Sequence, residues 1–293
     1  MKLIFLMTLF ALAVTRLVAQ PSRVIERIRN QSQVRQASVE LSYGNEDLQQ
    51  LDYWKPRLTE SPLVVFVHGG GWKSGDKAHA TDTKAAYFLS QGYGFVSMNY
   101  RLVPNVIVED QAHDVASAVA FLKKESSKLG FDARRIVLMG HSAGAHLVAL
   151  VGTDPVYLKK VGLGMDAVRG IIALDGACYD VPRQFSTGAA IMQETYKEAF
   201  GTDNKRQVAL SPTLQAAAPN VSSFLILHVQ RVDGIAQSNA LAEALKKAGI
   251  TAQVQGFDGN GMLGHLEINR RLGEADYAAT STVEQWLRKL LRP

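Results

Sequence analysis

Ser142 stands at the centre of the pentapeptide GHSAG, between Gly140 and Gly144. An apolar stretch, RIVLM, comes before the pentapeptide, and a helix-like stretch, AGAHLVAL, follows the serine. A sharp turn from strand to helix crowds the chain against itself, so it needs glycine on both sides, and it holds the serine hydroxyl outward. The pattern therefore predicts a serine nucleophile. The alternative is a tight turn in which the serine has no chemical role.

A run of glycines at residues 69–71 follows another apolar stretch, VVFVH. Without side chains, the backbone amides of such a run can approach a ligand closely. Acyl transfer needs donors aimed at the carbonyl oxygen where negative charge develops, and losing one donor raises the barrier by about 3 kcal/mol. We expect Gly70 and Gly71 to be two of these donors, and Ala143, at a helix N-terminus, to be the third. The alternative is a phosphate-binding loop, but the GK[ST] sequence and the dinucleotide fingerprint that such loops carry are absent after these glycines.

The elements that position these residues alternate between strand and helix. Between residues 109 and 129, apolar residues at 112, 115, 119 and 122 share one helical face. Continuous apolar strands separated by helices predict an α/β fold, with a parallel sheet covered on both faces and a site at the carboxyl ends of the strands. We expect strands at 38–44, 49–56, 62–70, 94–100, 135–140, 168–177, 224–229 and 251–257, and helices at 109–129, 143–152, 238–249 and 282–291. Residues 178–220 form a less regular insertion that roofs the site.

Composition excludes several classes of function. The chain has 293 residues, of which 47% are hydrophobic and 20% charged, and this suits one large globular domain. Its formal charge of +5 comes from scattered basic residues, without the clustered stripe or module of a nucleic-acid-binding protein. Cys178 is the single cysteine, so no internal disulfide forms. The seven histidines show no metal-ligand spacing, and we expect neither a metal nor another cofactor.

The first 19 residues have the pattern of a secretory signal peptide. Lys2 precedes an apolar run at residues 3–14, and LVA at 17–19 offers a small residue before a cleavage point. Twelve apolar residues are too few to span a bilayer comfortably. We therefore expect a secreted or periplasmic protein without a membrane span in its mature chain, with a polar lead-in at 20–37 and the catalytic domain at 38–293. The alternative is a chain anchored to a membrane by an uncleaved N-terminus.

The sequence HGGGW, followed some 70 residues later by GHSAGA, resembles the α/β-hydrolase superfamily. The resemblance is to the lipase and esterase branch with an HGGG oxyanion loop, and in particular to its small bacterial secreted carboxylesterases. LDYWKP, SMNYRL and LDGACYDVP extend the resemblance over residues 38–291, roughly. It implies an eight-stranded, mostly parallel sheet with helices on both faces, and a catalytic triad in the chain order serine, acid, histidine.

That order assigns the remaining members of the triad. His265 is the one histidine that follows every favoured acid, and it lies in the glycine-rich stretch DGNGMLGHLE, which we expect to be a loop after the last strand. The family places the acid after the penultimate strand, which indicates Asp233; Asp258 and Asp203 are the alternatives. Asp233 would hold the imidazole tautomer and stabilise the imidazolium. Asp233 could instead stabilise the start of a helix.

Residues that flank the site loops are candidates to bind substrate. Trp72, Tyr179 and Met262 are predicted to line the acyl or alcohol pocket, and the alternative for each is ordinary core packing. We expect Asp175 and Asp180, which flank the insertion, to have structural roles in holding the loop over the site.

These residues together predict a serine esterase. Ser142, activated by His265, would attack the carbonyl of a small-molecule ester with a short acyl group, such as an acetyl or aromatic ester, and form an acyl-enzyme. An arylformamidase or other amide hydrolase would use the same residues and is the first alternative. A non-catalytic binding protein on the same fold is the second. The sequence does not predict an oligomeric state.

Overall fold

A computed structural model describes residues 38–80, 83–217 and 219–291. The predicted signal peptide, residues 1–19, and the predicted lead-in, residues 20–37, lie outside the described residues. From Val39 onward, the described residues form one compact unit.

The unit is built on a single eight-stranded sheet with the order β1-β2-β4-β3-β5-β6-β7-β8. β2 runs antiparallel to both of its neighbours, and every other pairing is parallel. This confirms the prediction of a mostly parallel eight-stranded sheet. The strands are β1 (Val39–Ser42), β2 (Gln50–Trp54), β3 (Ser61–Val67), β4 (Gly94–Met98), β5 (Phe131–His141), β6 (Gly170–Leu174), β7 (Ser223–Gln230) and β8 (Thr251–Asn260).

Helices connect the strands. Those before β6 are η1 (Lys77–Ala80), α2 (Lys84–Ser90), α3 (Val108–Leu129), α4 (Ala143–Thr153), α5 (Pro155–Lys160) and η2 (Met165–Ala167). Between β6 and β7, in the segment where an insertion is expected, lie α6 (Val181–Thr187), η3 (Ala190–Met192), α7 (Gln193–Phe200), α8 (Asn204–Ala209) and α9 (Pro212–Gln215). The last three helices are α10 (Val232–Lys247), α11 (Gly261–Arg271) and α12 (Ala278–Leu290).

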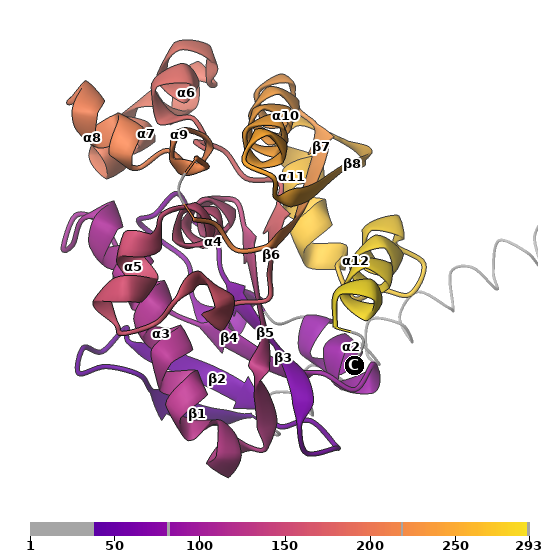
Figure 1. The fold of residues 1–293 in the computed structure, drawn as a ribbon. Helices are drawn as coiled ribbons and strands as arrows, with labels where there is room; N and C mark the ends of the chain where they lie inside the picture. The colour runs from indigo at the N-terminus through magenta and orange to yellow at the C-terminus, as the bar shows by residue number, and fades with distance from the viewer. Residues whose placement is uncertain (1–37, 81–82, 218, 292–293) are drawn as a thin grey trace, which may run out of the picture. The chain divides into compact units, whose positions relative to one another are not determined.

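Successive residues of a strand point to opposite faces of the sheet, and each face packs against its own set of helices. On one face, Val65 and Val67 of β3 belong to the main hydrophobic cluster with residues of α3 and α4. On the other face, Phe66 of β3 lies 6.5 Å from Phe95 of β4, and Phe95 stacks on Phe88 of α2 at 5.4 Å between ring centroids. Figure 1 shows α3 and α4 on one side of the sheet and α2 and α12 on the other. Helices on both faces are as predicted.

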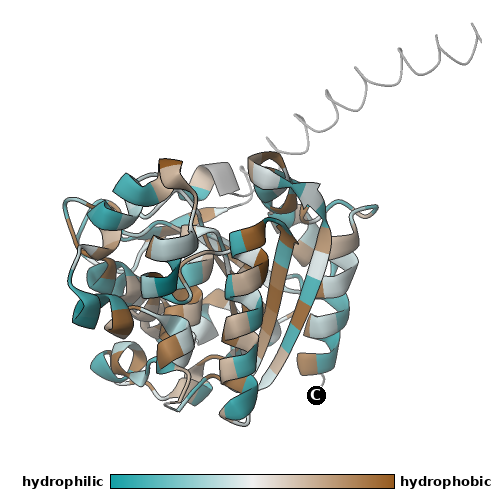
Figure 2. Ribbon diagram, turned by 90° about the horizontal axis from the view of Figure 1, so that it is seen from above, coloured by the Kyte–Doolittle hydropathy of each residue, from teal (hydrophilic) through white to brown (hydrophobic). Residues whose placement is uncertain are grey.

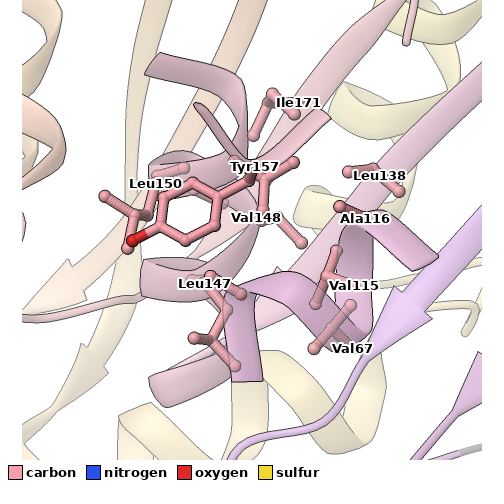
Figure 3. Packing of buried hydrophobic residues seen from close by; sticks show 14 of the residues in the cluster. Val67, Val115, Ala116, Leu138, Leu147, Val148, Leu150, Tyr157 and Ile171 are labelled. Atoms are coloured by element: carbon pink, nitrogen blue, oxygen red, sulfur yellow. The ribbon is translucent and has the colours of Figure 1, made fainter. Parts of the chain in front are cut away.

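Helix α4, which begins directly after Ser142, is buried at every position. Its sequence AGAHLVALVGT is apolar around almost the whole circumference, as expected of a helix at the centre of a domain. Figure 3 shows Leu147 and Val148 of α4 in one cluster with Val115 of α3 and the strand residues Val67 and Leu138. The serine turn is therefore fixed to the most deeply buried helix of the unit.

The sheet ends at β8, which pairs only with β7 among the described strands. β7 is apolar and buried for almost its whole length, whereas β8 alternates between hydrophobic and hydrophilic residues (Figure 2). The alternation fits an edge strand with one partly covered face. Within the described ranges, no helix is both long and apolar enough to span a bilayer.

Candidate active site

Ser142 occupies the sharp turn between β5 and α4. Its φ of 55° and ψ of −118° lie in a region that residues with a side chain rarely adopt. A Cβ at Gly140 would lie 2.2 Å from the carbonyl oxygen of Gly144, and a Cβ at Gly144 would lie 2.1 Å from that of Val67. Both glycines of GHSAG are thus required by space, as the sequence indicated.

The imidazole of His265 lies against the serine. Its Nε2 is 3.0 Å from Ser142 Oγ. The structure corrects one expectation, because His265 lies within α11 and not in a loop. Gly259 and Gly261 have φ values of 121° and 53°, which allow β8 to turn directly into the helix, and Gly264 packs against Gly259 so closely that a Cβ would lie 2.4 Å from its carbonyl carbon.

The acid beside His265 is Asp175, which directly follows β6. Asp175 Oδ2 lies 2.6 Å from His265 Nδ1, and Oδ1 accepts a hydrogen bond from Val229 N at 3.1 Å. The side chain is fully buried. Because an ionised carboxylate only accepts, Nδ1 of His265 carries the proton, and Nε2 is free to accept the serine proton.

Burial opposes ionisation of the Asp175 carboxyl. The hydrogen bond from His265 and the positive charge of Arg231 outweigh it, so the pKa of Asp175 lies below its ordinary value. Arg231 Nε donates to Asp175 Oδ2 at 3.0 Å. The carboxylate is therefore held ionised and in one orientation by three donors.

Asp233, the acid predicted from the sequence, does not contact His265, and the prediction was wrong. α10 begins at Val232, immediately after β7, so Asp233 lies in the first turn of this helix. Its Oδ2 accepts from Gln184 Nε2 at 3.0 Å and lies 3.6 Å from Arg231 Nη1. Negative charge in a first helical turn is favourable, which accounts for an aspartate there.

The other aspartates also differ in their roles. Asp203 and Asp180 each cap a helix, accepting from Lys205 N at 3.0 Å and from Arg183 N at 3.1 Å. The structural role expected of Asp180 is thus observed, whereas that expected of Asp175 is corrected. Asp258 lies in β8 and borders a different hollow from the one that contains Ser142.

His141, between Gly140 and Ser142, packs against the imidazole of His265. Its Nε2 donates to the backbone carbonyl of His265 at 2.9 Å, and the two rings lie 4.5 Å apart. Burial, together with the nearby charge of His265, places the pKa of His141 well below its ordinary value. His141 therefore stays neutral and acts as a hydrogen-bond donor at neutral pH.

A cavity of about 340 Å³ opens over Ser142 and is lined by Gly70, Gly71 and Met262, among others. The glycine loop comes close to the serine turn, since a Cβ at Gly69 would lie 3.0 Å from Ser142 Cβ. Ala143 is the first residue of α4. Within the described residues, the N–H groups of Gly70, Gly71 and Ala143 have no acceptor, so they can bind an external oxygen.

Two of the three predicted substrate-lining residues lie elsewhere. Trp72 is 2% exposed, and its Nε1 donates to His146 Nδ1 at 3.3 Å beneath the glycine loop. Tyr179 is fully buried and packs against Gly176, where a Cβ would lie 2.2 Å from its hydroxyl. Both belong to the core, which was the alternative considered for them. Met262 does line the cavity.

The cavity also contains polar residues that the sequence did not indicate. Asp76 and Asn269 lie in its wall with His68. Asp76 accepts from Asn99 Nδ2 at 3.0 Å and from Ala78 N at 2.7 Å. Across the described ranges, no group of three His, Cys, Asp or Glu residues is arranged to hold a metal ion.

The sequence is similar to several known hydrolases. A family model described as BD-FAE matches residues 51–176, which include the glycine loop, Ser142 and Asp175 but not His265. Esterase LipC of Mycobacterium tuberculosis is 27% identical over 217 residues, which cover 70% of this chain but only 54% of LipC. Kynurenine formamidase of Meyerozyma guilliermondii is 26% identical over 222 residues, which cover 72% of this chain and 81% of that enzyme.

The fold is shared with solved esterases. The crystal structure of esterase B from Lactobacillus rhamnosis matches with a TM-score of 0.70 at 21% identity and covers 94% of this chain and 93% of the esterase. At this identity the likeness shows a common fold. The chemistry therefore has to be argued from the site itself.

Proposed function

We propose that this chain, a member of the α/β-hydrolase superfamily, is a serine carboxylesterase that acts on small esters with short acyl groups. The proposal rests on the chain of hydrogen bonds from Asp175 through His265 to Ser142, with distances of 2.6 Å and 3.0 Å. This chain of hydrogen bonds ends in an open cavity beside free backbone N–H groups. Nucleophile, base, orienting acid and anion-binding donors are the parts that acyl transfer requires.

The reaction begins when His265 Nε2 takes the proton of Ser142 Oγ and the oxygen attacks the ester carbonyl carbon. The carbonyl oxygen becomes an oxyanion, which the N–H groups of Gly70, Gly71 and Ala143 stabilise. The bond to the alcohol oxygen then breaks, and His265 returns the proton to that oxygen. A water molecule, deprotonated by His265, attacks the acyl-enzyme and releases the carboxylic acid.

Asp175 keeps His265 ready for both proton transfers. It accepts the Nδ1 proton, which fixes the tautomer, and its negative charge stabilises the imidazolium that forms with each attack. His141 and Asp175 hold the same residue from two sides, one through the backbone carbonyl and the other through the ring.

Hydrolysis of p-nitrophenyl esters from acetyl to dodecanoyl, by wild type and by Ser142→Ala, tests the proposal. We expect wild type to cleave the short esters and the variant to lose this activity. Equal activity in both proteins would mean that Ser142 is only a turn residue. A wild-type protein that is inert towards every ester and every formamide would favour the non-catalytic binding protein.

A formamide hydrolase is the second candidate. It is supported by the similarity to kynurenine formamidase, which this chain matches over 81% of the length of that enzyme. The triad and the donors would act in the same way on a formyl carbonyl. The values of kcat/KM for phenyl acetate and for N-formylaniline, measured on one preparation, decide between the two.

Export of the protein is a further part of the proposal. It is supported by the basic and then apolar pattern of residues 1–19. We expect the protein recovered outside the cytoplasm to begin at residue 20, which N-terminal sequencing would check. An N-terminus at Met1 in the membrane fraction would instead support an uncleaved anchor.

A further inference from the structure

Four large, exposed apolar side chains lie on two elements, η3 and α11, that contribute residues to the wall of the catalytic cavity. Met262, Leu263 and Leu266 lie on α11 and are 57%, 78% and 54% exposed. Ile191 of η3 is 88% exposed, and its neighbour Met192 lines the cavity. We call Ile191, Met262, Leu263 and Leu266 the apolar rim. Exposed apolar residues scattered singly need no explanation, but a group at one site indicates binding.

The apolar rim is continuous with the place where the reaction occurs. Met262 and Leu266 line the cavity beside Ser142 and His265 and are also more than half exposed. Side chains three and four positions apart on a helix are neighbours, so Leu266 lies next to both Leu263 and Met262 and joins them into one apolar surface. A substrate whose carbonyl lies at Ser142 can therefore place the part that extends out of the cavity against these apolar side chains.

The chemistry of the site indicates which part of an ester lies there. His265 must return its proton to the alcohol oxygen, so the alcohol group has to lie on the His265 side of the serine. His265 is on α11, the helix that supplies three of the four rim residues. We propose that the apolar rim is an alcohol subsite, selective for esters of large apolar or aromatic alcohols. This inference rests on the proposed esterase function.

The test varies the alcohol while the acyl group stays acetyl. We would measure kcat/KM for methyl, phenyl and 1-naphthyl acetate with wild type, Leu263→Ser and Ile191→Ser. Losing contact with a large apolar group lowers kcat/KM for 1-naphthyl acetate about 3- to 10-fold more than for methyl acetate. Leu58→Ser is the matched control, because Leu58 is 73% exposed but precedes β3 at the opposite end from the glycine loop.

Three results would overturn the alcohol subsite. One is that the rim substitutions lower kcat/KM equally for all three acetates. Another is that they change the dependence of kcat/KM on acyl length when the alcohol is kept the same. The third is a change in oligomeric state on size-exclusion chromatography without a change in selectivity, which would assign the rim to self-association. A wild type that hydrolyses no acetate at all would refute the proposed function instead.

Arg231 carries a second inference from different contacts. Its Nε donates to Asp175 Oδ2, the same oxygen that accepts from His265 Nδ1, and its Nη2 contacts the carbonyls of Asp175 and Gly176 at 3.4 Å and 3.3 Å. The Arg231 side chain is 15% exposed. A guanidinium thus shares one carboxylate oxygen with the catalytic imidazole.

We propose that Arg231 is a positioning residue that fixes the Asp175 carboxylate and extends activity towards acidic pH. Its positive charge helps to hold the pKa of the Asp175 carboxyl below its ordinary value, so the carboxylate that orients His265 stays ionised as the pH falls. The other titratable or charged groups near Asp175, Arg231 and His265 are His141, Cys178, Tyr179, Tyr277, Asp233 and Lys84. This inference also requires the proposed function.

The test is the pH profile of kcat/KM between pH 4 and 9 for wild type, Arg231→Gln and Arg231→Lys. In Arg231→Gln we expect the acid limb to move to higher pH by about one unit and kcat to fall about tenfold. Arg231→Lys keeps the charge, so its acid limb stays near that of wild type. Asp233→Asn is the control, because it removes the other carboxylate near Arg231 and leaves Asp175 in place.

A uniform loss of rate in Arg231→Gln without movement of the acid limb would show that Arg231 acts only as a structural support. The inference would also fail if Arg231→Lys behaved like Arg231→Gln. If Arg231→Gln does not fold, the pH profile of Arg231→Lys is the test. Because this variant keeps the positive charge, an acid limb that moves to higher pH in it would overturn the role of charge.

Discussion

Replacing Asp175 and Asp233 one at a time would test the site most directly. Three donors converge on Asp175, from Val229 N, Arg231 Nε and His265 Nδ1. An asparagine at 175 offers a single acceptor oxygen, and its NH2 group would face at least one of these donors. The imidazole then loses its acceptor or takes the wrong tautomer, with Nε2 protonated and unable to accept from Ser142.

The expected loss in Asp175→Asn is large. Removing the charge of the acid in a serine triad while keeping its shape lowers kcat by about 10⁴-fold, which corresponds to about 5 kcal/mol in the barrier. Asp233→Asn removes only an ion pair with Arg231 at 3.6 Å, and its amide oxygen can still accept from Gln184. Such a partly exposed pair contributes little, so kcat should change less than about threefold.

The assay is steady-state hydrolysis of p-nitrophenyl acetate at about pH 7.5, the same for wild type and both variants. Circular dichroism and thermal melting would show that both variants are folded. The reasoning would be refuted if Asp233→Asn lost most of its activity while Asp175→Asn kept a tenth or more. That outcome would mean that the acid on α10 replaces Asp175 when substrate binds.

Three other perturbations have definite expected results. Gly144→Ala places a Cβ 2.1 Å from the carbonyl oxygen of Val67, so both activity and melting temperature should fall, whereas Gly162→Asn, in open space at a φ of 76°, should fold normally. Burial lowers the pKa of His146 to about 4 despite its hydrogen bond to Leu210, so the unfolded state, with a histidine pKa of about 6.5, binds the proton first as pH falls. The free energy of unfolding should therefore drop by about 3 kcal/mol between pH 6.5 and 4, and urea titrations of His146→Asn should show a smaller drop. Trp72→Phe should lower the melting temperature and leave KM within about twofold, because the indole packs in the core; a large rise in KM would return Trp72 to the pocket.

The fold could be predicted from the sequence because its signals are local. Buried parallel strands such as Ser61–Val67 read as continuous apolar runs, and the glycines around Ser142 mark a turn that no other residue fits. The order of the motifs also indicated His265, which the structure places 3.0 Å from Ser142 Oγ. α11 was missed because three glycines in its neighbourhood resemble a loop, although two of them serve to start the helix.

The identity of the acid could not be predicted in the same way. Asp175 and Asp233 each follow a strand near the carboxyl edge of the sheet, and spacing does not distinguish them. The only local signal for Asp175 was its position at the end of the strand beside the nucleophile strand, in the sequence LDG. The end of β7 and the residue that follows it supply the Val229 amide and Arg231 as donors to the acid, not the acid itself.

The sequence by itself indicated the serine turn, the glycine loop and the type of sheet, because each depends on backbone geometry that only certain residues allow, and the order of its motifs indicated the histidine that lies against Ser142. The tertiary structure decided which carboxylate faces the imidazole, which aromatic residues belong to the core, and which apolar side chains border the cavity. Those outcomes depend on side-chain directions across elements far apart in the chain, such as Asp175 and His265, which are separated by 90 positions. Only packing brings such residues together.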